Sequence, residues 1–199
     1  MSIKLDDSVT KTNLMRAFAG ESQARNRYVF AATQAKNEGK HVISAVFGYT
    51  ASQEEAHAKV FYNHLKELAG EKIVIEEASY PVNISDSLVS LLESAKCNEF
   101  EEHEPIYRQF GDTAMKEGYV NIANTFYMIA EIEKIHGERF ERLAELLKNN
   151  KLFVSDVEEE WLCLNCGHVH KGMSAPEICP VCYHNQGFFI RFSFSPYEK

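Results

Sequence analysis

Apolar residues recur every three or four positions through most of the chain, from about Thr10 to Asn149. This spacing places them on one face of a helix, and a composition rich in Ala, Leu, Glu, Lys and Arg favours helix as well. Gly39, Gly70 and Gly118 stand where the first three apolar stripes end. The pattern predicts a mainly α protein built around a four-helix bundle. The stripes cover residues 14–32, 43–68, 88–110 and 122–147.

The connection between the second and third stripes, EKIVIEEASYPVNI, is too long for a tight turn between antiparallel neighbours. We therefore expect it to cross the length of the bundle. Ser85 or Ser87 is the expected cap of the third helix. Pro105 lies inside that stripe and removes the N–H that would bond the Glu101 carbonyl. A kink is therefore predicted just past Glu102.

Each stripe also carries glutamate on the face that should point inward, about halfway along its helix. Antiparallel packing would bring these side chains to one level of the bundle core. Buried, unpaired carboxylates are costly, because desolvation and mutual repulsion both disfavour their ionised form. We therefore expect cations among them. The glutamates are Glu21, Glu54, Glu99, Glu102 and Glu133.

Two of the helices carry Glu-x-x-His, as Glu54 with His57 and Glu133 with His136. The spacing puts each Glu and His on the same helix face, one turn apart. A single such pair is usually a solvated surface pair. Two copies on apolar stripes, with acids at the matching level of the other two helices, form the ligand set of a dinuclear carboxylate site.

Charge counting supports two irons in this site. Two ferrous ions against five ionised carboxylates leave one net negative charge, and two ferric ions with one bridging oxide leave the same charge. The buried site could then change oxidation state at constant net charge.

The chain changes character at about Trp161, where Cys, Pro, Gly, His and aromatic residues replace the helical pattern. Cys163-x-x-Cys166 and Cys179-x-x-Cys182 are separated by twelve residues and could form a tetrahedral thiolate cage. Sulfur ligands alone do not separate zinc from iron, so a structural zinc ribbon stays open for the tail in isolation. A redox-active dinuclear site in the same chain needs electrons, and this favours a one-electron Fe(Cys)4 centre.

Apolar side chains close to the cysteines are expected to exclude water from the thiolate site. They are Trp161, Pro180, Phe188 and Phe189. The preceding segment, NNKLFVSDVEEE, is the expected linker. Residues 1–150 should therefore form the bundle, and residues 151–199 the linker and the metal-binding domain. Cys97, which belongs to neither pair, is expected to be a small core thiol.

The formal net charge of −8 argues against nucleic acid as a partner, since phosphate binding needs clustered Lys and Arg. The N-terminal stretch has no unbroken apolar run of signal-peptide length, and no later stretch approaches the roughly 20 apolar residues of a membrane span. Four of the five cysteines sit in tight pairs, which favours metal binding in a reducing compartment. We expect a cytoplasmic protein that does not associate with membranes.

Five stretches together resemble the rubrerythrin family over nearly the whole chain. They are AFAGESQARNRY, EEAH, NEFEEHEPIY, AEIEKIHGERF and WLCLNCGHVHKGMSAPEICPVC. The resemblance implies a ferritin-like diiron bundle followed by a rubredoxin-like domain. It also implies a peroxidase that reduces hydrogen peroxide to water in oxidative stress defence, and a homodimer in which one chain's tail approaches the other chain's bundle.

Carried over by position, the resemblance gives each inner-face ligand a role. Glu54 and Glu133 would bridge the two irons, which are joined by an oxide when oxidised. The implied terminal ligands are Glu21 and His57 on one iron, and Glu99 and His136 on the other.

The resemblance makes Glu102 a redox-linked ligand, bound to the first iron in the oxidised state and exchanging with His57 on reduction. Tyr28 and Tyr107 match tyrosines beside the family's ligands, although a core tyrosine with its hydroxyl at a polar site accounts for either. With Glu54, these residues form the implied catalytic set. The kink predicted at Pro105 departs from the family pattern and bears directly on the position of Glu102.

No Gly-x-Gly-x-x-Gly follows a strand pattern, so NAD(P)H would have to be oxidised by a separate protein. The expected electron donor is a rubredoxin or an NAD(P)H-dependent reductase. One rival interpretation is a ferritin-like iron-binding protein with ferroxidase activity, which Glu102 and the electron-transfer tail argue against. Another is a metal-stabilised interaction protein with zinc in the tail.

Overall fold

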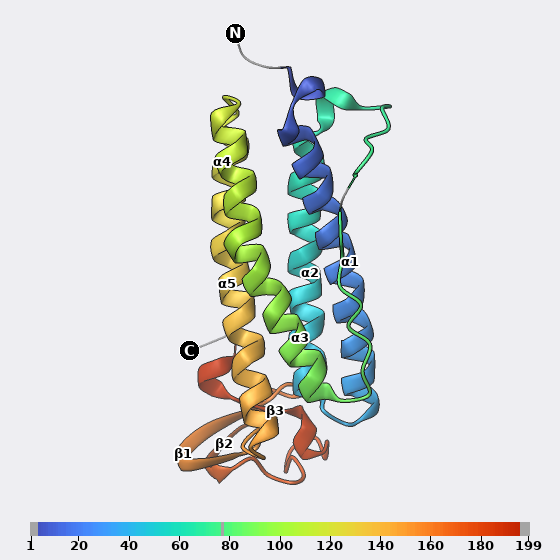
Figure 1. The fold of residues 1–199 in the computed structure, drawn as a ribbon. Coiled ribbons are helices and arrows are strands. Elements are labelled where there is room, and N and C mark those ends of the chain that lie inside the picture. The colour runs from blue at the N-terminus through green and yellow to red at the C-terminus, as the bar shows by residue number, and fades with distance from the viewer. Residues whose placement is uncertain (1–3, 77, 196–199) are drawn as a thin grey trace.

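The computed structural model describes residues 4–76 and 78–195. Helices α1 (Val9–Asn37) and α2 (His41–His64) form one antiparallel pair, and α3 (Leu88–Glu101) packs against α5 (Val120–Lys148) in the other (Figure 1). A small domain of strands follows α5 at one end of the bundle. The predicted mainly α four-helix bundle with a C-terminal metal-binding domain is confirmed.

Capping hydrogen bonds and a glycine set the two ends of α1. The Ser8 side chain accepts a hydrogen bond from the Lys11 backbone N–H at 3.0 Å and so caps the first turn. Glu117, far away in sequence, accepts hydrogen bonds from the backbone N–H groups of Val9 and Thr10. The helix stops before Gly39, whose φ of +68° continues the chain in the left-handed region that glycine adopts without strain.

Residues 71–87 contain no helix or strand among their described positions and run back along α1, as predicted for the crossover (Figure 1). Arg16 donates from Nη2 to the Glu76 carbonyl at 2.8 Å, and the Tyr80 hydroxyl donates to the Arg16 carbonyl at 3.1 Å. These bonds fix the crossover on α1. The Ser87 hydroxyl then accepts from the Ser90 N–H at 3.3 Å, so Ser87 caps α3.

The third helix is interrupted just past Glu102. A π-helical segment, Glu102–Tyr107, separates α3 from α4 (Arg108–Lys116). Glu104 within it has extended backbone angles, with φ −152° and ψ 122°, and the Glu104–Pro105 peptide bond is cis. The kink predicted from Pro105 is confirmed, but the single continuous helix expected over residues 88–110 is wrong.

Cys97 is exposed, so the prediction of a core thiol is also wrong. The buried positions of α3 are Leu88, Leu92, Ala95 and Glu99. Position 97 falls between the last two, on the other side of the helix.

The bundle interior has two apolar clusters with polar side chains between them. The cluster nearer the C-terminal domain contains Phe47, Phe140 and Leu92, and the other contains Phe61 and Phe126. The polar side chains between them are buried, and they come from all four long helices. They are Glu21, Glu54, His57, Glu99, Glu133 and His136.

The C-terminal domain is a three-stranded antiparallel sheet in the order β2-β1-β3. Its strands are β1 (Val154–Cys163), β2 (Val169–Ser174) and β3 (Phe189–Arg191). Most of the expected linker is therefore the first strand. Its acidic side chains are exposed or half-buried, and Glu158 pairs with Lys171 at 3.0 Å. Their charge explains why this segment has no recognisable strand pattern in the sequence.

Trp161 and Phe189 are fully buried against Cys163 and Cys179, as expected for the apolar surroundings of the thiolate site. Phe188 packs against this cluster while partly buried. Pro180 is exposed and takes no part in the cluster, so its predicted role is wrong.

The C-terminal domain is fixed to the end of the bundle. The Phe188 ring stacks on His41, at the start of α2, with centroids 3.9 Å apart. Gly187 approaches the α1–α2 turn so closely that a Cβ on it would lie 1.8 Å from the Gly39 carbonyl oxygen. Ile190 of β3 is part of the adjoining apolar cluster of the bundle. The close approach of Gly187 to Gly39 leaves no room for a side chain at position 187.

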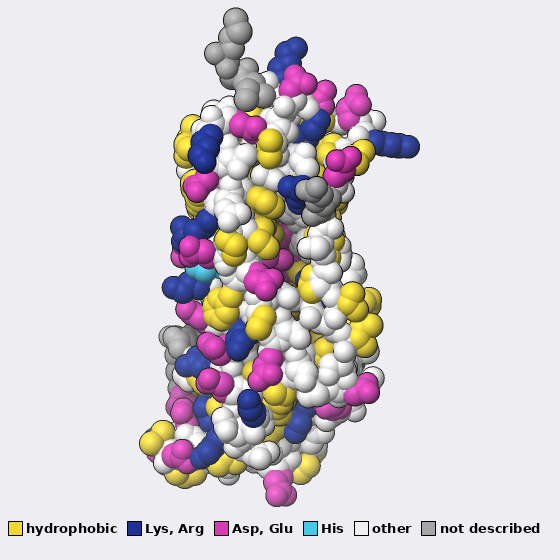
Figure 2. All heavy atoms as spheres, in the orientation of Figure 1, with side chains coloured by type: hydrophobic (Ala, Val, Ile, Leu, Met, Phe, Trp, Pro, Cys, Tyr) yellow, Lys and Arg dark blue, Asp and Glu magenta, His cyan; other side chains and the backbone are white. Residues whose placement is uncertain are grey.

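Acidic and basic side chains are interspersed over the face shown in Figure 2. Within residues 4–76 and 78–195, no helix combines the length and the apolar character needed to cross a membrane.

Candidate metal centres

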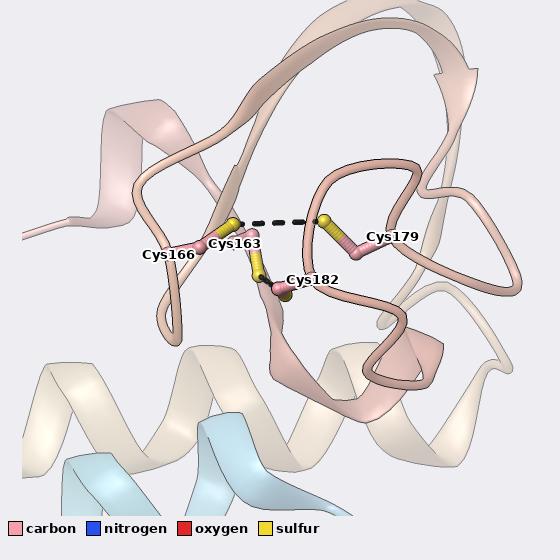
Figure 3. A group of neighbouring side chains, drawn as sticks. All are labelled: Cys163, Cys166, Cys179 and Cys182. Atoms are coloured by element: carbon pink, nitrogen blue, oxygen red, sulfur yellow. Dashed lines mark hydrogen bonds between the residues drawn. The ribbon is translucent and has the colours of Figure 1, made fainter.

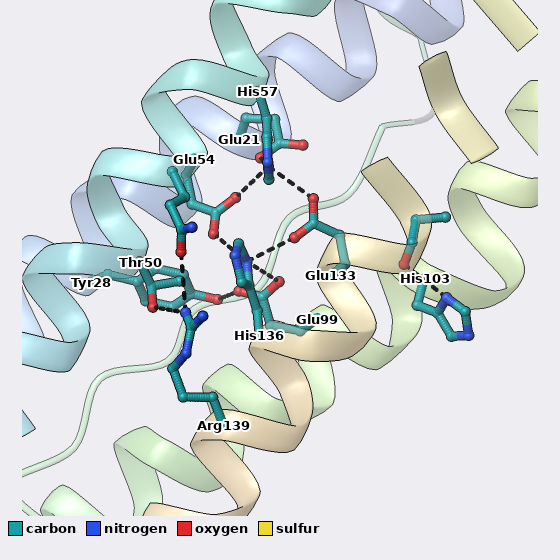
Figure 4. A network of polar contacts seen from close by, with 12 residues as sticks. Glu21, Tyr28, Thr50, Glu54, His57, Glu99, His103, Glu133, His136 and Arg139 are labelled. Carbon is teal, nitrogen blue, oxygen red and sulfur yellow. Dashed lines mark hydrogen bonds and ion pairs between the residues drawn. The ribbon is translucent and has the colours of Figure 1, made fainter. Parts of the chain in front are cut away.

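The inner-face ligands meet at mid-bundle and form two overlapping groups (Figure 4). Within each group, one ligand atom from every residue lies within 4.8 Å of the others. The two groups share two carboxylates, which come from opposite helix pairs. The first group is Glu21, Glu54, His57 and Glu133, and the second is Glu54, Glu99, Glu133 and His136.

Glu54 and Glu133 each offer one oxygen to each group. Glu54 places Oε2 3.2 Å from His57 Nδ1 and Oε1 2.9 Å from His136 Nδ1. Glu133 places Oε1 3.0 Å from His57 Nδ1 and Oε2 2.9 Å from His136 Nδ1. Two carboxylates that span two neighbouring positions in this way have the geometry of bridging ligands.

Glu21 and Glu99 serve one group each, and each accepts a hydrogen bond from a buried tyrosine. Tyr107 donates its hydroxyl proton to Glu21 Oε1 at 2.6 Å, and Tyr28 donates in the same way to Glu99 Oε1. The other oxygen of Glu21 lies 3.6 Å from the first histidine, and that of Glu99 lies 3.5 Å from the second. The tyrosines thus hold one oxygen and turn the other inward.

Among the described residues, most buried side-chain polar atoms without a hydrogen-bond partner lie in this cluster. Glu54 Oε1 and His136 Nδ1, for example, lie 2.9 Å apart without forming a hydrogen bond. Buried polar atoms left without partners are costly, and divalent cations would satisfy them. The carboxylate and histidine cluster therefore fits a diiron site. The atoms are Glu21 Oε2, Glu54 Oε1, Glu99 Oε2, Glu133 Oε1 and Oε2, and His136 Nδ1 and Nε2.

The cluster strongly favours positive charge. Burial raises the pKa of Glu21 well above its ordinary value, and repulsion from Glu133 raises it further. Burial by itself would lower the pKa of His136, but its contacts with Glu133 and Glu54 raise it to about 12. Burial would raise the pKa of Glu54, but its close contacts with His136 and His57 lower it to about 2. Metal ions supply this positive charge when they displace the imidazole protons.

Glu102 belongs to neither ligand group. A Cβ on Gly20 of α1 would lie 3.8 Å from Glu102 Oε1 and equally far from the Tyr80 ring, so this carboxylate lies beside α1 and the crossover. The next residue, His103, has Nδ1 2.8 Å from the Ala130 carbonyl oxygen and holds the π-helical segment on α5. His57 lies among the ligands instead, and the role of Glu102 as a ligand stays a prediction.

One polar contact beside the second ligand group is not predicted from the sequence. Arg139, three residues after His136, donates from Nη1 to the buried Thr50 hydroxyl at 2.9 Å (Figure 4). The only sign of it in the sequence is an arginine on the same helix face as the candidate ligand His136.

The four cysteines of the C-terminal domain converge as predicted (Figure 3). Cys163 Sγ lies 3.7 Å from Cys182 Sγ, and Cys166 Sγ lies 3.7 Å from Cys179 Sγ. A tetrahedron with metal–sulfur bonds of about 2.3 Å has edges of about 3.8 Å, so these separations suit a tetrathiolate metal site. The backbone N–H of His184 donates to Cys182 and helps to lower the pKa of that thiol to about 6.

A shared-carboxylate site at mid-bundle and a tetrathiolate site in an appended domain define a class: diiron four-helix bundle proteins that carry a rubredoxin-like iron domain. The family model described as Rubrerythrin matches residues 12–144, and the one described as Rubrerythrin, rubredoxin-like domain matches residues 161–190. The chain belongs to the rubrerythrin family. Its four cysteines form a rubredoxin-like iron site, and the family indicates an oxidoreductase that works with a redox partner.

Similar proteins cover nearly the whole chain. Rubrerythrin-1 of Clostridium acetobutylicum is 43% identical over 186 residues, which is 93% of this chain and 95% of the relative. The rubrerythrin of Clostridium perfringens is 41% identical over 189 residues, covering 94% of this chain and 96% of the relative. A solved structure of nigerythrin in a mixed-valence state superposes with a TM-score of 0.61 at 26% identity, covering 96% of this chain and 88% of the other. Bacterioferritins match the bundle as well, which confirms the ferritin-like fold class.

Proposed function

We propose that this protein is a cytoplasmic non-haem diiron peroxidase, which reduces hydrogen peroxide to water in oxidative stress defence. The reaction consumes two electrons and two protons, breaks the O–O bond and yields two water molecules. Two bound ferrous ions would supply the two electrons. The observation that carries the proposal is the paired geometry of Glu54 and Glu133, which offer one oxygen each to two adjacent positions in a chain that also has an electron-transfer domain.

The ligand roles in this proposal follow the two groups. Glu54 and Glu133 bridge, Glu21 and His57 complete the first position, and Glu99 and His136 complete the second. Tyr107 and Tyr28 orient the terminal carboxylates through their hydroxyl hydrogen bonds. The apolar clusters on both sides keep bulk water from the reacting centre.

Glu102 is the proposed seventh ligand, which exchanges with His57 as the oxidation state changes. A carboxylate suits the more highly charged ferric pair, and a neutral imidazole suits the ferrous pair. The break in the helix after Glu101 supports this role, because a segment outside regular α-helix can shift its side chains without moving α3 or α5.

The C-terminal iron site is the proposed electron relay, and the active unit is a homodimer. Phe188 and Gly187 fix the domain at the start of α2, and Glu54 lies thirteen residues further along that helix. At 1.5 Å per residue this is about 20 Å, so a chain's own relay lies far from its own diiron site. This distance supports delivery from the partner's domain. The domain would in turn be reduced by a rubredoxin or an NAD(P)H-dependent reductase, which are the proposed redox partners.

One observation favours a second candidate, a ferritin-like iron-binding protein with ferroxidase activity. The two ligand groups contain six residues without Glu102, and plain ferroxidase centres need no seventh ligand. Steady-state assays separate the two functions. A peroxidase consumes peroxide continuously from a supplied reductant at constant bound iron. A ferroxidase instead consumes added ferrous ion and accumulates ferric iron.

A further inference from the structure

Arg139 joins the two helices that carry the Glu-x-x-His pairs. From α5 its Nη1 donates to Thr50 Oγ1 at 2.9 Å and to Gln53 Oε1 at 3.1 Å, and both acceptors belong to α2. Its guanidinium also lies over the Tyr49 ring, 5.3 Å from the centroid. Thr50 is fully buried, so this is an interior tie between the helices.

The contact between Arg139 and Thr50 lies one helical turn from the metal ligands on both helices. Thr50 lies one turn before Glu54 on α2, and Arg139 lies one turn after His136 on α5. Because the two helices are antiparallel, the Arg139–Thr50 contact follows directly after the Glu54–His136 contact along the bundle. It lies on the side of the second ligand group, away from His57.

The closest helix packing lies elsewhere, between α1 and α2 and between α3 and α5. The ligands of the second group are therefore divided between two helix pairs, and their spacing depends on what joins those pairs. We propose that Arg139 is a positioning residue for the second metal position. Its bonds to Thr50 and Gln53 hold α2 at the distance from α5 at which Glu54 and His136 face each other. The proposal rests on the metal centre and holds for a peroxidase and a ferroxidase alike.

The direction in which a mutation changes metal affinity distinguishes this positioning role from an effect of charge alone. A guanidinium beside a cation site repels the cation, so removing its charge should tighten metal binding if electrostatics alone mattered. Removing the tie should weaken binding, because ligands that are no longer held in place must be ordered by the metal itself.

Arg142 provides a matched control. It lies on α5 one turn beyond Arg139, and both line the same cavity of about 660 Å³ between α2, α5 and the C-terminal domain. Its guanidinium packs over the Phe194 ring at 3.7 Å. Arg142→Met removes the same charge from the same cavity and leaves the contact with Thr50 intact.

The experiment titrates the full-length protein with Mn²⁺, after the bundle has been freed of metal and with the tetrathiolate iron in place. Mn²⁺ prefers oxygen and nitrogen ligands to thiolates, and free Mn²⁺ is measured by electron paramagnetic resonance. Wild type should bind two ions per chain. Arg139→Met should bind one of them about tenfold more weakly, the size typical of a lost supporting contact. Thr50→Val, which keeps the positive charge, should weaken the same ion by a smaller factor because Gln53 still accepts.

Far-ultraviolet circular dichroism and the visible absorption of the iron domain establish that each variant is folded. Unchanged or tighter binding of both ions in folded Arg139→Met overturns the proposal, as does an equal weakening in Arg142→Met. If Arg139→Met does not fold, Thr50→Val decides, and unchanged affinity there overturns the proposal. None of these titrations uses peroxide, so the result is independent of the proposed activity.

Discussion

Glu54 on α2 and His136 on α5 face each other at 2.9 Å, although they are 82 positions apart in the chain. The contact joins the two helix pairs, which also meet on either side of it where Phe47 packs on Phe140 and Phe61 on Phe126. The Glu-x-x-His pairs of α2 and α5 therefore contribute side chains to the same two ligand groups.

The first prediction concerns metal removal. Ions that bind only the folded chain stabilise it by about 4 kcal/mol at a thousandfold excess over the dissociation constant. For a domain of this size, that corresponds to a fall in Tm of roughly 8–16 °C when the bundle loses its metals. Thermal melts followed by circular dichroism test this, with the visible absorption of the tetrathiolate iron as the control that only the bundle was stripped. Coincident melts at neutral pH would count against a metal site in the bundle core.

The second prediction concerns Tyr107. Tyr107→Phe leaves Glu21 Oε1 buried without its donor, so the metal-free protein should lose about 1–3 kcal/mol of unfolding free energy. The matched control is Tyr127→Phe, since the Tyr127 hydroxyl donates to the exposed Asp112 at 2.7 Å and its loss should cost far less. Urea denaturation of both variants provides the comparison. Equal losses of unfolding free energy in the two variants would mean that the buried hydrogen bond to Glu21 stabilises the fold no more than an exposed one does.

Much of this site could be predicted because its ligands obey a helical spacing. Glu54 with His57, and Glu133 with His136, are fixed on one face of their own helices by local geometry alone. The position of Glu102 could not be predicted, because it depends on how the backbone departs from α-helix at Glu104.

Contacts between distant elements also cannot be predicted from the sequence. The bond from Arg139 to Thr50 depends on the register of α5 against α2, which no local pattern encodes. The strand over residues 154–160 is not predicted from the sequence, because its acidic side chains are typical of a solvated segment and its pairing partners lie later in the chain. The fold class could be predicted because helical periodicity and the two C-x-x-C pairs are local signals.

The third prediction concerns pH and Glu117. Its carboxylate accepts from the N–H groups of Val9 and Thr10 and from the Thr10 hydroxyl, and these bonds lower its pKa although slight burial acts in the opposite direction. A carboxylate with a lowered folded pKa stabilises the fold above its unfolded pKa of about 4.3, and this contribution is lost as pH falls through the folded pKa.

Glu117→Gln should therefore cost up to about 1 kcal/mol of unfolding free energy at pH 7, as expected for a lost cap at a helix start. The difference from wild type should shrink as pH falls below about 4. Glu71→Gln, at an exposed position outside the helices, is the control and should show little effect. A difference that stays constant from pH 7 to pH 3 would contradict the capping role of the charge.

The fourth prediction separates the two metal centres. Cys179→Ser removes a buried ligand of the tetrathiolate site, and turnover driven by an external reductant should fall to background. A chemically prereduced bundle in the same variant should still consume one peroxide per diiron site. Sustained wild-type turnover in a variant shown to lack the tail iron would exclude the relay.

The fifth prediction concerns Glu102. Glu102→Ala should keep two irons through the remaining six ligands, because this side chain belongs to neither ligand group. Without the carboxylate that the proposal assigns to the ferric pair, oxidation by peroxide should slow relative to oxidation by dioxygen. Stopped-flow mixing of the prereduced variant with each oxidant gives the ratio of the two rates. A ratio equal to that of wild type, with both irons present, would remove Glu102 from the mechanism.

The same ratio in the wild-type protein decides whether the diiron site is a peroxidase. The full-length protein is reduced without oxygen, its diiron content is measured, and it is mixed with equal concentrations of hydrogen peroxide or dioxygen. We predict that peroxide oxidises the diferrous site faster by orders of magnitude, with one peroxide consumed per diiron site. Faster oxidation by dioxygen would contradict the peroxidase assignment and favour the ferroxidase.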